Sequence, residues 1–198
     1  LFCFTAVSTQ YWQVKKVAKY IKSVDNNIFC LLGGHEASMN SQNVIQQGIF
    51  DAICVSEGEK AVVEVADSIE NGFINKDIYN IWFYNRVNGE TKKNFNSPFT
   101  QNLDDLPLFN RKVWDKWIKR PDDYPAILLG RGCPFKCTYC ANHAMQKLAE
   151  GKFVRFRSPE HIIKELDYWL EYELPKNLDM KEAPISEELT KTNWHRNR

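Results

Sequence analysis

The N-terminal third of the sequence alternates short apolar segments with segments of helical periodicity, and this alternation restricts the chain to few folds. Residues 1–7, 28–32 and 52–55 are apolar runs of strand length. In residues 14–21 and 59–69, apolar side chains recur at steps of three and four, as they do on one face of a helix. Strands that are apolar on both faces and alternate with helices predict an α/β domain, in which helices cover a parallel sheet.

A different pattern follows in residues 81–93, where alternating residues flank Asn88-Gly89. This dipeptide is a strong hairpin signal, so we expect a small antiparallel addition to the sheet domain. Residues 97–123 contain three prolines and several acidic residues, a composition that predicts a linker.

Beyond the linker, residues 124–129 are apolar and predict a strand, and residues 159–170 predict a helix with Ser158 at its N-cap. The expected buried side of that helix consists of Ile162, Ile163, Leu166 and Leu170. The sequence thus suggests four parts: a sheet domain in residues 1–75, a hairpin and linker in 76–123, the start of a second domain in 124–174, and an irregular tail in 175–198.

Composition excludes some classes of partner. The 26 Lys and Arg residues nearly balance the 25 Asp and Glu residues, and a net charge of +1 provides no field that would attract nucleic acid. No apolar run approaches the roughly 20 residues that span a bilayer, and no basic segment precedes an apolar one at the N-terminus. We therefore expect a cytoplasmic protein without a membrane span and without a nucleic-acid partner.

Three of the six cysteines are crowded into one loop, Cys133-Pro-Phe-Lys-Cys137-Thr-Tyr-Cys140, next to Gly130 and Gly132. This distribution argues against a disulfide framework and for a metal site in a reducing compartment. Iron–sulfur clusters are normally held by four cysteine thiolates. Three thiolates would therefore leave one iron of a [4Fe–4S] cluster open to another ligand.

This CxxxCxxC loop resembles the cluster-binding loop of the radical S-adenosylmethionine (SAM) superfamily. The flanking Arg131-Gly-Cys-Pro, Asn142 and residues 155–160 (RFRSPE) resemble the same superfamily. The resemblance implies that SAM binds the open iron and is cleaved to a 5′-deoxyadenosyl radical, which abstracts hydrogen from a small-molecule substrate. It also implies that Tyr139 lies against the adenine of SAM, that a flavodoxin or ferredoxin supplies electrons, and that residue 124 begins a TIM-type barrel.

An alternative for the loop is a zinc site formed by the three cysteines and His143, since Cys₃His is an accepted tetrahedral ligand set. Zinc sites usually combine two separate pairs of ligands, so this pattern favours the cluster. The other cysteines, Cys3, Cys30 and Cys54, lie singly in apolar segments and are expected to act as small buried hydrophobic residues.

In the N-terminal part, residues 4–9 (FTAVST), 31–35 (LLGGH) and 55–59 (VSEGE) resemble the Rossmann-like cobalamin-binding domain of B12-dependent radical SAM proteins. All three segments end a predicted strand, where parallel sheets form their ligand crevice. The resemblance implies a cofactor site formed by Thr5, Ser8, Gly33, Gly34, Glu57 and Gly58. The Asp-x-His-x-x-Gly sequence that carries a lower ligand of cobalt is missing, and His35 is expected to be a turn or capping residue.

Length limits what the chain can do alone. A TIM-type barrel needs about 250 residues, and the chain ends 75 residues after Asp123. We expect a truncated radical SAM protein whose parent reaction is cobalamin-linked methyl transfer or a related C–H activation. Two alternatives stay open: a catalytically inactive α/β module that binds a cluster or a nucleotide-like ligand, and a zinc-binding interaction domain.

Overall fold

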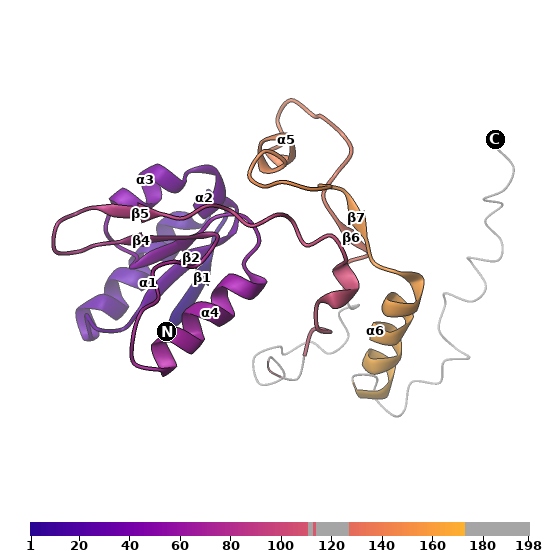
Figure 1. Cartoon of the computed structure of the whole chain (residues 1–198), viewed down its shortest axis with the longest axis horizontal. Coiled ribbons are helices and arrows are strands. Elements are labelled where there is room, and N and C mark those ends of the chain that lie inside the picture. The colour runs from indigo at the N-terminus through magenta and orange to yellow at the C-terminus, as the bar shows by residue number, and fades with distance from the viewer. Residues whose placement is uncertain (111–112, 114–126, 173–198) are drawn as a thin grey trace, which may run out of the picture. The chain divides into compact units, whose positions relative to one another are not determined.

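The computed structural model describes residues 1–110, 113 and 127–172 (Figure 1). They fall into two compact units. The first comprises residues 1–103 and 130–156, and the second comprises the described residues of 104–129 and those from 157 onward. The expected tail, residues 175–198, lies outside the described residues. So do residues 111–112 and 114–123 of the expected linker.

A five-stranded sheet forms the centre of the first unit (Figure 1). Its order is β1 (Phe2–Thr5), β2 (Cys30–Gly33), β3 (Ala52–Cys54), β4 (Ile81–Tyr84) and β5 (Thr91–Lys93). The first three strands are parallel, as the alternation of strands and helices predicts, whereas β3–β4 and β4–β5 are antiparallel. The hairpin around Asn88-Gly89 is therefore confirmed, and it extends the main sheet, because β4 pairs along the free edge of β3. The fold is α/β with a mixed sheet.

Helices cover both faces of this sheet. On one face lie α1 (Tyr11–Val24), α2 (Gly34–Met39) and α3 (Ser41–Gln46), and on the other lies α4 (Glu59–Glu70). Successive strand residues point to opposite faces of the sheet and so belong to two separate hydrophobic cores. Leu32 packs with the first group of helices, and Leu31 packs with α4. Each of these leucines is fully buried, which stabilises the fold by about 2 kcal/mol per side chain.

The helix after β3 is confirmed, but its inward face differs from the one that apolar spacing predicts, which consists of Val62, Val63, Ala66 and Ile69. The core contains Ala61, Val65 and Ser68, whereas Val63 is 56% exposed. Val62 and Ile69 pack only at the margin of that core. Because apolar residues are frequent in α4, the sequence is compatible with two neighbouring helix faces as the buried one. The packing of α4 on the sheet selects the face that contains Ala61, Val65 and Ser68. In α1, Val17 is also exposed, although the spacing of Val14, Val17, Ala18 and Ile21 predicts it on the apolar face.

The segment after β2 is a helix, α2, although the Gly33-Gly34 pair predicts a tight loop there. The helix begins at Gly34 directly after the strand ends at Gly33. Gly34 has a φ of +86°, which changes the direction of the chain in a single residue. The Gly-Gly pair therefore replaces a loop, and the six residues from Gly34 show no apolar periodicity from which a helix could be predicted.

The cysteine-containing segment belongs to the first unit. It begins with β6 (Gly130–Arg131), contains α5 (Asn142–Met145) and ends with β7 (Arg155–Phe156), which pairs with β6 in antiparallel fashion. The prediction of a strand at 124–129 is wrong for residues 127–129, which are not in a strand. Residues 124–126 lie outside the described residues. Strand pairing starts at Gly130. The absence of a Cβ at Gly130 and Gly132 lets the returning segment approach closely, because a side chain at either position would collide with its backbone.

In the second unit, α6 (Pro159–Tyr172) is the expected helix. Its N-cap is confirmed, since the Ser158 hydroxyl oxygen accepts the N–H of His161 at 3.1 Å. The expected buried side is wrong in part: Ile163 is 55% exposed and Leu166 is also exposed, because the described residues place no strand against that side. The side chain of Leu170 lies outside the described part. Among the described residues, no helix has both the length and the apolar character needed to cross a membrane.

Candidate functional site

The carboxyl ends of the parallel strands bring together three of the residues expected at the ligand crevice. Thr5 ends β1 and is paired in register with Gly33 at the end of β2. A Cβ atom on Gly34 would lie 2.5 Å from the Thr5 hydroxyl oxygen and 2.9 Å from the carbonyl oxygen of Ala6. The chain thus uses Gly34 to let two backbone segments approach each other, and this explains the double glycine in part without a ligand.

Ser8 lies at the same end of the sheet and is bound to a residue that the sequence interpretation missed. Its hydroxyl donates to Glu36 Oε2 at 2.5 Å, and Asn40 Nδ2 donates to Glu36 Oε1 at 2.9 Å. The Glu36 N–H donates to the Ala6 carbonyl oxygen at 2.9 Å. Glu36 is buried, and no charge pattern in the sequence distinguishes it from a surface glutamate.

The loop between β3 and α4 carries the third expected segment and departs from ordinary backbone geometry. Ser56 has a φ of +79°, an uncommon conformation for a residue other than glycine. Its N–H donates to Ser38 Oγ at 3.1 Å, while its own buried hydroxyl has no hydrogen-bond partner among the described residues. Gly58 follows, where a Cβ would lie 3.2 Å from the Cys54 sulfur. Such strain at a strand end is typical of ligand sites.

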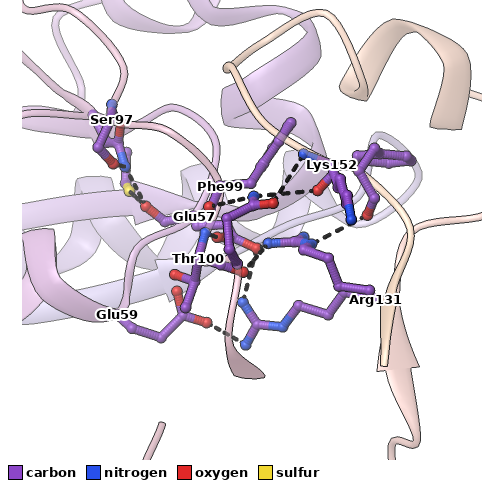
Figure 2. A network of polar contacts seen from close by, with 12 residues as sticks. Glu57, Glu59, Ser97, Phe99, Thr100, Arg131 and Lys152 are labelled. Atoms are coloured by element: carbon purple, nitrogen blue, oxygen red, sulfur yellow. Dashed lines mark hydrogen bonds and ion pairs between the residues drawn. The ribbon is translucent and has the colours of Figure 1, made fainter. Parts of the chain in front are cut away.

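Glu57, in the same loop, accepts hydrogen bonds from three segments of the first unit (Figure 2). Its Oε1 receives Arg131 Nη1 at 3.0 Å and Arg155 Nη2 at 2.9 Å, and its Oε2 receives the N–H of Thr100 at 2.8 Å. Burial by itself would raise the pKa of the Glu57 carboxyl, but the bonds from Arg155, Thr100 and Arg131 outweigh burial and lower it. Glu57 is therefore a carboxylate at neutral pH.

The two arginines differ in burial. Arg155 has only 4% of its side chain exposed, and its Nη1 also donates to the carbonyl oxygen of Thr100 at 2.7 Å. Arg131 is 31% exposed and uses its second nitrogen, Nη2, to bind Glu59 (Figure 2). Burial alone would lower the pKa of Arg131, but its bonds to Glu59 and Glu57 raise it. Both arginines occur in the segments that resemble radical SAM proteins, but sequence alone did not connect them with Glu57.

Asn80 fixes the backbone side of Glu57 and was also missed. It is buried, has a φ of +67°, and donates from Nδ2 to the Glu57 carbonyl oxygen at 2.6 Å and to Ser97 Oγ at 3.0 Å. Its Oδ1 accepts the N–H of Ser97 at 2.7 Å. Asparagine tolerates this left-handed conformation better than most residues, which is the only local signal that the sequence offered.

The lowered pKa of the Glu57 carboxyl predicts that the stability of the fold depends on pH. A lowered pKa in the folded state contributes stability that is complete above the unfolded value of about pH 4.3 and is lost as the pH falls through the folded pKa. The free energy of unfolding of the wild-type chain should therefore exceed that of Glu57→Gln above pH 5, and the difference should shrink in acid. Urea unfolding at a series of pH values measures this. A difference that does not change with pH would show that Glu57 titrates as an unpaired carboxyl.

The thiols of Cys133, Cys137 and Cys140 are free, and all three lie at least partly at the surface between β6 and α5. Tyr139 is 92% exposed, so its ring is available to a ligand. Within the described residues, no three His, Cys, Asp or Glu side chains are gathered closely enough to hold a metal ion. The donor set fits a cluster chemically, since three free thiols share one short loop, but the loop has to draw them together on binding.

The remaining cysteines behave differently. Cys30 and Cys54 are buried as expected, and burial raises the pKa of both thiols. The pKa of Cys54 is raised to about 12, mainly by burial and in smaller part by the negative charge of Glu59. They are therefore neutral thiols in the core and poor metal ligands. The expectation is wrong for Cys3, which is exposed because β1 is an edge strand of the described sheet.

No family model matches the chain. It is 28% identical over 172 residues to an uncharacterized methyltransferase of Pyrococcus horikoshii, covering 85% of this chain and 36% of that protein. The anaerobic magnesium-protoporphyrin IX monomethyl ester cyclase of Rubrivivax gelatinosus is 24% identical over 172 residues, covering 82% of this chain and 30% of the cyclase. The hopanoid C-3 methylase of Methylococcus capsulatus is 26% identical over 166 residues, covering 78% of this chain and 29% of the methylase. The chain spans about a third of the length of these curated relatives, and over most of its own length it is similar to a methyltransferase, a cyclase and a methylase.

Proposed function

We propose that this chain is the cluster-binding and SAM-binding part of a radical SAM protein. The observation that carries the proposal is the cysteine loop, whose three free thiols share one short surface loop. The aligned relatives support it, because two of them are named for methylation and one for ring closure. Cobalamin-linked methyl transfer or a related C–H activation is the reaction we propose for the whole protein, on a small-molecule substrate, in the cytoplasm.

In this proposal, Cys133, Cys137 and Cys140 hold three irons of a [4Fe–4S] cluster as thiolates. When bound, the cluster supplies the electron that cleaves SAM, and a reductant such as flavodoxin or ferredoxin replaces that electron. Tyr139 provides an exposed aromatic face for the adenine of SAM. Arg131, at the base of the loop, holds the segment through its ion pairs with Glu57 and Glu59.

A second ligand, cobalamin or another nucleotide-like molecule, is proposed for the strand-end crevice. Thr5, Ser8, Gly33, Gly34, Glu57 and Gly58 are the proposed lining. The support is their position at the carboxyl ends of three parallel strands, next to the strained Ser56. Because the side chains of Ser8 and Glu57 are already bound to Glu36 and the arginines, ligand contacts would come mainly from the backbone of these loops.

The experiment is anaerobic reconstitution of the chain with iron and sulfide, followed by EPR of the reduced protein with and without SAM. We expect bound iron and sulfide, and a spectrum that changes when SAM is added. Tyr139→Ala should keep the cluster, since the ring is exposed, but should need more SAM for the same spectral change.

Other outcomes identify the competing functions. A colourless protein that takes up one zinc ion would contradict the proposal and favour the zinc-binding interaction domain. A cluster whose spectrum ignores SAM would favour the inactive module. Formation of 5′-deoxyadenosine by the purified chain under strong reductant would show that this part alone cleaves SAM.

A further inference from the structure

The convergence on Glu57 joins segments that are far apart in the sequence. Arg131 lies 74 residues and Arg155 lies 98 residues from Glu57, and Thr100 lies 43 residues away. All four residues belong to the first unit. One carboxylate therefore connects the loop after β3 with both strands that flank the cysteine segment.

The strands alone are too short to fix the base of the cysteine loop. β6 and β7 have two residues each, and an isolated two-stranded ribbon is marginally stable in water. The returning side has additional support, since the Phe99 N–H donates to the Glu150 carbonyl oxygen at 2.9 Å and Asn96 Nδ2 donates to the Leu148 carbonyl oxygen at 2.7 Å. On the outgoing side, the side-chain bonds described for β6 are those of Arg131 to Glu57 and Glu59.

Burial makes Glu57 the more important of the two glutamates. The guanidinium of Arg155 is buried and lies over the Phe99 ring, 5.0 Å from its centroid, and its ion pair in the described structure is with Glu57. Removing the partner of a buried charge strongly destabilises the folded protein, whereas an exposed ion pair contributes little to its stability. Glu59 is more exposed than Glu57 and binds Arg131 alone.

Arg131 also lies only two residues before Cys133, a separation of at most about 7 Å along the chain. Whatever fixes Arg131 therefore fixes the start of the cysteine loop and sets the charge beside it. Asn80 and Thr100 hold Glu57 itself in place from the backbone side.

We propose that Glu57 is a positioning residue: its carboxylate fixes the base of the cysteine loop on the sheet domain and neutralises the two arginines there. This role differs from the ligand contact proposed for Glu57 at the strand-end crevice, and the loop-fixing part needs no cluster. Only the effect on the cluster rests on the proposed function.

The first test uses the metal-free chain and hydrogen–deuterium exchange of residues 129–134 and 153–157. Glu57→Gln should raise exchange there at least tenfold, while exchange in β2 and α1 stays near the wild-type rate. Glu59→Gln is the matched control and should change the rates less than twofold, because it removes only the exposed arm of Arg131. Equal exchange in the wild type and in Glu57→Gln would overturn the proposal.

If Glu57→Gln unfolds, Arg131→Gln provides the same information from the other side. It leaves the buried Arg155–Glu57 pair intact, so it should raise exchange in residues 129–134 and leave residues 153–157 protected. Unchanged protection in both segments would contradict the proposal.

The second test uses the reconstituted chain. Without the Glu57 carboxylate, the buried Arg155 loses its ion-pair partner and Arg131 keeps only the more exposed Glu59. The midpoint potential of the cluster should therefore become more positive in Glu57→Gln than in Glu59→Gln. A merely structural loss would lower iron content without moving the potential of the remaining clusters, and that result would reject the charge effect. If the wild-type chain binds no iron at all, the proposed function fails, while the exchange experiment still decides the role of Glu57.

Discussion

Replacing any one of Cys133, Cys137 and Cys140 with alanine is expected to reduce cluster-bound iron from about four atoms per chain to near zero. Two remaining thiolates leave two irons of the cluster without protein ligands. The three thiols lie at or near the surface, so the substitutions should leave the fold intact. Iron and sulfide analysis with visible absorption after anaerobic reconstitution measures the loss, and circular dichroism checks the fold.

Cys30→Ala is the matched control. Its thiol is buried in the sheet, far in sequence from the loop, so this variant should keep its cluster and lose only about 1 kcal/mol of stability. Full iron content in any of the three loop variants would mean that the loop is not the ligand set. Equal loss in Cys30→Ala would mean that iron uptake reports general folding.

Gly34→Ala is expected to destabilise the chain by about 4 kcal/mol. The positive φ costs about 1 to 3 kcal/mol for a residue with a Cβ, and crowding in a packed region adds about 1 to 3 kcal/mol. The crowding arises because the new methyl group would lie 2.9 Å from the carbonyl oxygen and 3.0 Å from the nitrogen of Ala6, which are backbone atoms. Such a loss is a large fraction of the 5 to 15 kcal/mol typical of a domain. Urea unfolding at neutral pH measures it.

Two other glycines separate the causes. Gly72 has a φ of +78° but no atom within 4 Å of its Cβ position, so Gly72→Ala should cost only about 1 kcal/mol. Gly33 has extended backbone and ordinary contacts at 3.8 Å, so Gly33→Ala should be tolerated. Equal losses at Gly34 and Gly72 would mean that the close approach of Thr5 and Ala6 carries no energetic weight.

The expected loss at Gly34 also affects how a ligand in the strand-end crevice can be tested. A bulky substitution at Gly34 would reduce ligand binding through unfolding, whether or not the ligand touches that residue. Gly33 is the better position, because a Cβ atom there meets the Phe4 carbonyl oxygen and the Cys54 Cβ only at van der Waals distance. Loss of cobalamin binding in a folded Gly33→Val variant would therefore indicate a ligand near the double glycine.

Features that depend on neighbours along the chain could be predicted from the sequence. Apolar periodicity located β1 to β3, α1 and α4, because a helix or strand buries side chains at its own repeat. Asn88-Gly89 located the β4–β5 hairpin, and Ser158 located the start of α6, because turns and caps are made within a few residues. The cysteine spacing identified the candidate ligands in the same way, although their role stays a prediction.

Features that depend on contacts between residues distant in sequence could not be predicted from it. The antiparallel pairing of β4 with β3, the inward face of α4 and the exposure of Cys3 all follow from which element packs against which. The network of Glu57, Arg131 and Arg155 is the clearest case. Each of these residues lies in a segment that the sequence singles out, but nothing in the sequence connects the three, and only folding brings them together. The physical reason is that a buried charge is stable only with a partner, and the partner is chosen by the path of the chain in space.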